Sequence, residues 1–218
     1  MRLWGDIPDW VYDSSRALMQ SLSVVDPLTH AHCLRVGDAA ARLAQDAGLN
    51  DYEQRLAQFA GFFHDIGKIG IPQEIIAKPG KLDPKEYDIM KSHPVISEEI
   101  VRPLASVEFF RHMLPAIRGH HERMDGQGYP DGKSGEDIPI LARIILIVDP
   151  YDAMSETRAY RRGLPDEVVY AELKRCAGTQ FDPQLGKVFL EAHPRWKKSG
   201  EKSEEAQIVT FPSLRRAG

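Results

Sequence analysis

The chain has 218 residues, of which 42% are hydrophobic and 28% are charged, and its net charge is −4. This composition is typical of one globular domain, and the acidic balance argues against a general binder of nucleic-acid polymers. Two cysteines build no disulfide framework and favour a reducing compartment, so we expect a cytoplasmic protein. No signal peptide is expected, and the longest apolar run, IPILARIILIV, is too short and too interrupted to cross a membrane.

The spacing of apolar residues predicts helices through the first half of the chain. The first is expected over residues 8–25, and a turn at DPLTH separates it from a second over residues 29–47. A third is expected within residues 50–65, behind a capping residue at its start. The stretch LDPKEYDIMKSH begins a fourth, with Asp83 as N-cap, Pro84 at the first helical position and a glutamate three residues after the cap. We expect His93 to end this helix, just before a proline.

The second half alternates helices with one long loop. Residues 106–121 are predicted to be helical despite Pro115, and the loop ERMDGQGYPDGKSGEDIP follows with four glycines and two prolines. The run ILARIILIVD would also suit a buried strand, but no comparable strand accompanies it, so we assign it to a central buried helix. Two more helices are expected over residues 165–177 and 183–192.

The expected fold class is therefore all-α, a single bundle of about seven or more helices. Residues 1–24 would form an N-terminal helix packed on a domain over residues 25–196, and residues 197–218 would form a polar, flexible tail.

Seven side chains that metals favour stand within or beside the apolar segments. They are His32, His64, Asp65, His93, His120, His121 and Asp149. A lone histidine in such a place is usually structural, but burying the whole set without a cation would be costly. A donor set of imidazoles and carboxylates without a thiolate suits iron, manganese, zinc, nickel or cobalt.

Several segments, in order along the chain, resemble the HD-GYP domain family. They are HDIGKIGIPQEIIAKPGKL, MKSHP, HHERMDGQGYP, IPILARI, and VDPYDAM followed by RAYR. The family is the bacterial branch of the HD metal-dependent phosphohydrolases that cleaves cyclic di-GMP, and the resemblance covers roughly residues 25–192.

The resemblance implies two divalent metal ions, iron or manganese first, with nickel, cobalt or zinc as alternatives. His32, His64, Asp65 and Asp149 would bind one metal, and Asp65 would bridge to a second held by His93, His120 and His121. Such a pair would activate the attacking water and stabilise the departing oxygen at phosphorus.

The resemblance also implies contacts to the substrate. Lys68, Arg158 and Arg161 would hold phosphates, with solvated surface charge as the simpler alternative for all three. Tyr129 lies in the long loop over residues 122–139, the GYP loop, and would either support the site or face a partner protein. Glu122 and Asp125 could orient the histidines from behind.

Two positions depart from the family pattern. Some members carry a metal-binding glutamate four residues before the first histidine ligand, where this chain has Leu28, so two metals rather than three are expected. Pro150 directly follows Asp149 and could kink its helix and change how the carboxylate faces the site.

The resemblance predicts a metal-dependent phosphodiesterase that hydrolyses cyclic di-GMP to the linear dinucleotide, with GMP formed slowly if at all. The alternative is a metal-containing module that binds the dinucleotide, or docks to a diguanylate cyclase domain through the GYP loop, with little turnover. A general HD nucleotidase is disfavoured by the long GYP loop. Neither a nucleic-acid polymer nor a membrane is an expected partner.

Overall fold

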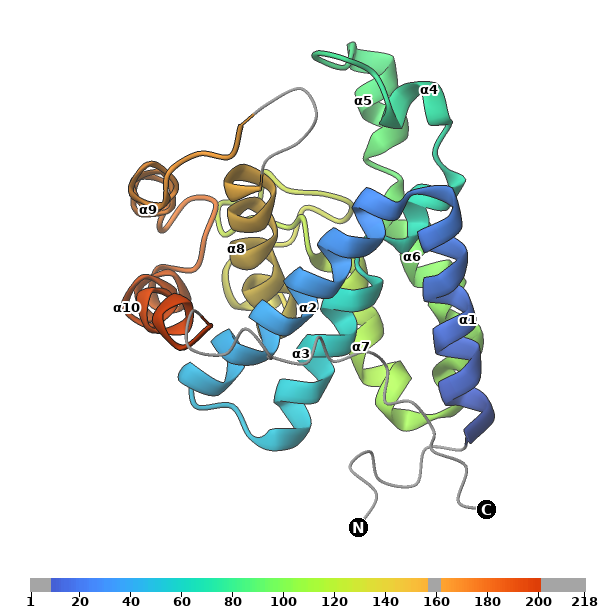
Figure 1. Cartoon of the computed structure of the whole chain (residues 1–218), viewed down its shortest axis with the longest axis horizontal. Coiled ribbons are helices and arrows are strands. Elements are labelled where there is room, and N and C mark those ends of the chain that lie inside the picture. Colours follow the sequence, from blue (N-terminus) through green and yellow to red (C-terminus); the bar gives the residue numbers. More distant parts are fainter. Residues whose placement is uncertain (1–8, 157–161, 201–218) are drawn as a thin grey trace.

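The computed structural model describes residues 9–156 and 162–200, and its regular elements there are all helices (Figure 1). The predicted all-α fold is confirmed. The elements are α1 (Asp9–Val25), α2 (Pro27–Asp46), α3 (Asp51–Phe63), α4 (Gln73–Ile76), α5 (Pro84–Met90), α6 (His93–Val101), α7 (Glu108–Gly119), α8 (Ile140–Ser155), α9 (Asp166–Arg175) and α10 (Pro183–Gly200), with the 3-10 helices η1 (Ile66–Gly70), η2 (Arg102–Ser106) and η3 (Gly135–Asp137).

Side chains at the helix starts explain where several helices begin. Asn50 caps α3 and Asp83 caps α5, as their sequences predicted, and each cap is part of a reciprocal capping box. Helix α2 begins two residues earlier than predicted. The Asp26 carboxylate accepts from the backbone N–H groups of Leu28 and Thr29, at 3.1 and 3.0 Å, and Pro27 is preorganised for the first turn.

Two further predicted boundaries are wrong. His93 begins α6 rather than ending the preceding helix, because the proline after it fits the first turn of a new helix. Helix α10 continues to Gly200, so residues 197–200 belong to it rather than to a tail. The Lys197 ammonium donates to Asp166 at 2.6 Å, which ties this last part of α10 to α9. Residues 201–218 lie outside the described part of the chain.

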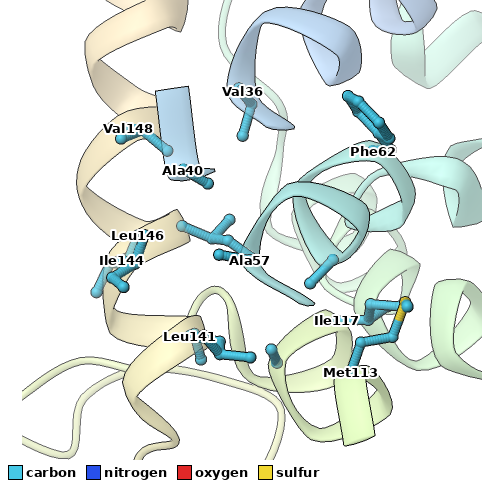
Figure 2. Packing of buried hydrophobic residues seen from close by; sticks show 14 of the residues in the cluster. Val36, Ala40, Ala57, Phe62, Met113, Ile117, Leu141, Ile144, Leu146 and Val148 are labelled. Carbon is cyan, nitrogen blue, oxygen red and sulfur yellow. The ribbon is translucent and has the colours of Figure 1, made fainter. Parts of the chain in front are cut away.

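The core lies where α2, α3, α7 and α8 meet (Figure 2). The apolar run of α8 is buried almost throughout, which confirms it as the central helix. Its single charge, Arg143, is matched by Asp182, whose Oδ2 lies 2.7 Å from the guanidinium Nη1. Met19 and Leu22 of α1 join the same core, and α9 and α10 lie on the other side of α8 from α1 (Figure 1).

Helices α2 and α3 cross with their backbones almost touching. A Cβ atom on Gly61 would lie 2.6 Å from the Cα of Gly37, closer than real Cβ contacts come. Only glycine permits this crossing, and it brings the rings of His32 and His64 to a centroid distance of 5.4 Å.

None of the helices in residues 9–156 and 162–200 has both the length and the apolar character required to cross a lipid bilayer.

Candidate metal centre

The structure brings all seven predicted ligands together from separate helices. His32 lies in the middle of α2, and Asp149 lies in α8. The other five stand at helix ends: His64 and Asp65 follow α3, His93 begins α6, and His120 and His121 follow α7. Most of these side chains are buried, while His121 and Asp149 are partly exposed.

One half of the centre joins α2, α3 and α8. Ligand atoms of His32, His64 and Asp149 all lie within 4.8 Å of one another. His32 Nε2 is 3.0 Å from Asp149 Oδ1, and His64 Nε2 is 4.0 Å from the same oxygen.

The other half joins α6 and the end of α7. Ligand atoms of His93, His120 and His121 also lie within 4.8 Å of one another. Asp65 stands between the halves. Its Oδ1 is 3.1 Å from His93 Nε2, and its Oδ2 is 3.4 Å from His64 Nε2.

Three of the rings are oriented by backbone carbonyls. In each, ring Nδ1 lies 2.6 or 2.7 Å from the carbonyl oxygen three residues earlier: His64 on Gly61, His93 on Met90, and His120 on Ile117. A carbonyl can only accept, so Nδ1 carries the hydrogen and Nε2 of the neutral ring presents a lone pair to the centre.

These lone pairs face one another rather than donors. His93 Nε2 and His120 Nε2 are 3.2 Å apart. His64 Nε2 and Asp65 Oδ1 are buried and have no hydrogen-bond partner. Buried acceptors without donors are costly, and a cation shared among them removes the cost. The donor set therefore fits divalent metal ions.

The protonation of the centre suits metal binding as well. Burial lowers the pKa of His64 and, more strongly, that of His120, and it lowers the pKa of His121 to about 3. Burial opposes ionisation of Asp65 and Asp149. Positive charge from Lys68 at Asp65 and a hydrogen bond from His32 at Asp149 outweigh it and hold both pKa values well below the usual range. Deprotonated carboxylates and neutral imidazoles are the forms that bind metals.

His32 differs from the other rings. Burial opposes its protonation, but hydrogen bonds to Asp149 and Asp152 outweigh burial and raise its pKa to about 9. Without metal, the imidazolium of His32 and the ammonium of Lys68 supply the positive charge that the two buried carboxylates require.

A serine fixes the break between α3 and η1 where the HD pair stands. Ser97 of α6 is fully buried; its hydroxyl donates to the His64 carbonyl at 2.7 Å and accepts from Gly67 N–H at 2.8 Å. This clip holds His64 and Asp65 against the helix that carries His93.

Of the three residues predicted to contact phosphate, only Lys68 lies in the described part of the chain. Lys68 of η1 donates to Asp65 Oδ2, and its side chain is 24% exposed, so the ammonium lies at the edge of the centre. Arg158 and Arg161 lie outside the described residues.

The GYP loop packs directly on a predicted ligand. The Tyr129 ring lies 4.7 Å, centroid to centroid, from the His121 ring, and Tyr129 N–H donates to the His121 carbonyl at 3.2 Å. A Cβ atom on Gly128 would lie 2.5 Å from that same carbonyl oxygen, so this approach requires glycine. Tyr129 therefore contacts the ring of a predicted ligand, and its role at the site stays a prediction.

Glu122 and Asp125 shape the loop instead of the rings. The buried Glu122 carboxylate accepts from the backbone N–H groups of Asp131 and Lys133, at 2.7 and 2.9 Å. Asp125 pairs with Arg123 and accepts from Gln127 N–H. The expectation that these two carboxylates orient the histidines is replaced by a role in the loop.

Sequence reasoning missed three residues at the centre. Asp152 lies 2.7 Å from His32 Nδ1, and Arg35 binds Asp152 through two nitrogens. Cys33 brings a buried thiol within 4.8 Å of ligand atoms of His64 and Asp65, although the predicted set lacked a thiol. The available signal was spacing, because Arg35 follows His32, and Asp152 follows Asp149, by three residues on a helix.

The two departures from the family pattern are both visible. Helix α8 continues through Pro150 to Ser155, and Asp149 still faces His32, so the proline does not turn the carboxylate away. Leu28 lies in α2 one turn before His32, with 73% of its surface exposed.

Five imidazoles and two carboxylates meet at one centre of a helical bundle, an arrangement typical of metal-binding proteins. The HD domain family model matches residues 16–185. The chain belongs to the HD domain family, and its motifs place it in the HD-GYP branch.

The chain is similar to several curated relatives. A cyclic di-GMP phosphodiesterase of Thermotoga maritima is 36% identical over 182 residues, which cover 84% of this chain and 49% of that protein. The cyclic di-GMP phosphodiesterase response regulator RpfG of Xanthomonas campestris is 38% identical, covering 77% of this chain and 44% of that protein. The chain thus spans about half the length of the curated relatives it matches.

Solved structures show the same fold. A cyclic GMP-AMP-specific phosphodiesterase of Vibrio cholerae superposes with a TM-score of 0.66 at 19% identity, covering 93% of this chain and 54% of that one. An HDG"Y"P protein from Bdellovibrio bacteriovorus gives a TM-score of 0.61 at 19% identity, covering 85% of this chain and 62% of that one.

Proposed function

We propose that the protein is a metal-dependent phosphodiesterase that hydrolyses cyclic di-GMP to the linear dinucleotide. The observation that carries the proposal is the group of inward-facing lone pairs at a buried centre, with His64 Nε2 and Asp65 Oδ1 lacking any hydrogen-bond partner. Relatives named as cyclic di-GMP phosphodiesterases support the choice of substrate.

The proposed ligands divide as the two halves of the centre do. His32, His64, Asp65 and Asp149 would hold one metal, and His93, His120 and His121 with Asp65 would hold the other, with iron or manganese as the first candidates. When bound, such a pair supplies Lewis acidity for an attacking water and a departing oxygen at phosphorus.

The chain's own groups orient the substrate. The partly exposed members of the site, Lys68, His121, Tyr129 and Asp149, mark the side from which a phosphodiester can approach. Burial opposes the charge on Lys68, but Asp65 outweighs burial and raises the lysine pKa, so the side chain stays an ammonium. Lys68 therefore acts as an electrostatic contact to phosphate rather than as a proton acceptor.

Turnover by the metal-loaded protein tests the proposal. Anaerobically purified protein, loaded with Fe²⁺ or Mn²⁺, should convert cyclic di-GMP to the linear dinucleotide, and a His112→Ala variant should match it. His112 is a suitable control because its ring pairs with Tyr52 and Glu108, not with the centre. Metal-loaded protein that binds cyclic di-GMP without turnover would overturn the enzyme and favour the binding or cyclase-docking module.

Both cysteines are free, which supports the proposed cytoplasmic location.

The two arginines that follow α8 carry a separate prediction. Arg158→Ala and Arg161→Ala should each weaken cyclic di-GMP binding about tenfold or more, because a charge-assisted hydrogen bond is worth about 1.5–3 kcal/mol. Their metal content should stay at the wild-type value. Titration with substrate at fixed salt measures the effect. Unchanged affinity in both variants would show that these arginines are solvated surface residues that do not contact the substrate.

A further inference from the structure

The anchors of the site histidines follow from where each ring stands in its helix. His64, His93 and His120 follow the ends of α3, α5 and α7, where the last carbonyls have no N–H group four residues later within the helix. Those free carbonyls accept from ring Nδ1. A helix end thus provides both the ligand and the group that orients it.

His32 has no such carbonyl. It lies inside α2, which runs from Pro27 to Asp46, and interior carbonyls already accept from the backbone four residues on. Its anchor comes from another helix instead. Nδ1 of His32 lies 2.7 Å from Asp152 Oδ2 of α8, while its Nε2 lies 3.0 Å from Asp149 Oδ1 on the side of the centre.

Arg35 holds the anchoring carboxylate. Its Nε donates to Asp152 Oδ1 at 2.7 Å and its Nη2 donates to Asp152 Oδ2 at 2.8 Å, a two-point pairing that fixes the carboxylate plane. Arg35 follows His32 by three residues, so one face of α2 supplies both the ligand and the clamp. Asp152 is only 9% exposed, so little solvent competes for its hydrogen bonds to His32 and Arg35.

We infer that Asp152, clamped by Arg35, is a positioning residue for His32, and that the metal position of His32, His64 and Asp149 depends on it while the position of His93, His120 and His121 does not. Asp152 keeps the hydrogen of His32 on Nδ1 and leaves Nε2 to bind. The inference rests on the metal centre of the proposed function and is independent of the substrate.

Metal titration of the folded protein tests this dependence. Free Mn²⁺, measured by electron paramagnetic resonance, should reveal two sites in the metal-stripped wild-type chain. In Asp152→Ala one site should weaken 10–100-fold, the range typical of losing a histidine's outer partner, and the other should change less than about twofold. In zinc-loaded samples, nitrogen-15 correlation spectra of the rings should show the Nδ1–H of His32 protected from exchange with water in the wild-type chain and exchanging faster in the variant, because its acceptor is gone.

Asp182→Ala is the matched control. Asp182 is also buried and also paired with an arginine, Arg143 at 2.7 Å, but it caps α10 and touches no site histidine. This variant should lose stability and keep both manganese affinities. It separates the general effect of removing a buried carboxylate from the specific effect of removing the partner of His32.

Each outcome has one meaning. Two unweakened sites in Asp152→Ala, or equal weakening of both in a folded variant, would overturn the inference and leave the proposed function standing. A wild-type chain that binds no Mn²⁺ would overturn the metal centre itself. If Asp152→Ala does not fold by circular dichroism, Asp152→Leu decides, since it keeps a similar volume and removes both acceptor oxygens. It should still weaken one site only, and wild-type affinity at both sites would reject the role.

Discussion

Buried ionisable side chains at the centre form a set that is stable only as a whole. Asp65 lies against Lys68, His64 and His93, so its negative charge compensates the lysine ammonium while its oxygens face the Nε2 lone pairs of two rings. Removing one member leaves the others with unmatched charge in a region of low dielectric. The chemistry of the site should therefore be more sensitive to single substitutions than the fold is.

Asp65→Asn and His121→Ala test that difference. Each should lose tightly bound metal and lower turnover by more than about 100-fold, beyond the 10–100-fold typical of an outer-shell partner. Helical content should survive, because neither side chain belongs to the apolar core. Metal analysis, rate measurement and circular dichroism check the three expectations. Near-wild-type hydrolysis by either purified variant would refute the ligand assignment.

His193 provides a pH-dependent contribution to stability away from the centre. It is 7% exposed, and Tyr170 Oη lies 2.7 Å from its Nδ1, where a neutral ring accepts the phenol hydrogen. Burial, together with Lys197 and Arg42, outweighs Asp166 and lowers the pKa of His193 from 6.5 to about 4. The unfolded chain then binds more protons than the folded chain between these pH values, so stability falls as pH falls through the window.

The expected size of this effect is measurable. Between pH 7.5 and 5.5, protonation of the unfolded histidine should lower the free energy of unfolding by about 1 kcal/mol. His193→Gln should remove that part of the pH dependence, and urea unfolding at the two pH values measures the difference. Equal pH dependence in wild type and variant would show that the ring already titrates normally in the folded chain.

At the scale of elements, helix ends and one tight crossing build the site. The HD pair stands where α3 stops, and the HH pair stands where α7 stops. The crossing of α2 and α3 at Gly37 and Gly61 sets how far His32 lies from His64. A shift of either helix should therefore change the affinity of the centre for metal.

Gly61→Ala should separate α2 from α3. The new Cβ atom would meet the backbone of Gly37 at 2.6 Å, and overpacking of this kind costs about 1–3 kcal/mol. Metal affinity should fall with it, because the histidines of the two helices move apart. Gly186→Ala in α10 is the control. A Cβ there meets nothing within 4 Å, and the helix should gain about 0.5–1 kcal/mol. Denaturant unfolding and manganese titration of both variants decide, and wild-type stability in Gly61→Ala would contradict the crossing.

Local signals along the chain predicted most elements but not the contacts between them. The capping residues Asn50 and Asp83 and the buried run of α8 act within a few residues, so pattern and propensity were enough. Pro94 misled the boundary at His93, because a proline is compatible with either ending or beginning a helix.

The candidate site shows the same division. The ligand set rested on a family resemblance, which carries contacts that no local pattern contains. Asp152 escaped notice because its partner His32 is 120 residues away, a pairing that exists only after α2 packs on α8. The same holds for Cys33, whose thiol reaches His64 and Asp65 through the packing of α2 on α3.

At the scale of the whole molecule, the centre links helices that lie far apart in the sequence. Its ligands come from α2, α8 and the ends of α3 and α7, with His93 at the start of α6. A ligand that binds only the folded chain stabilises it by mass action, by about 2.7 kcal/mol at a concentration 100 times the dissociation constant. Metal binding should therefore raise the free energy of global unfolding.

The number of metals is the last prediction, and it turns on Leu28. This side chain stands in α2 one turn before His32, where residues four apart share a helix face, but it offers no oxygen. The wild-type chain should bind two metal ions, and the linear dinucleotide should accumulate, because without a third cation Lys68, Arg158 and Arg161 would have to neutralise the new terminal phosphate. Leu28→Glu should raise the count toward three, while Leu28→Gln, of similar size and uncharged, should keep two. Metal analysis of anaerobically loaded protein measures the count. Three ions in the wild-type chain would refute the argument from Leu28, whereas rapid conversion to GMP by a two-metal protein would refute only the expected product.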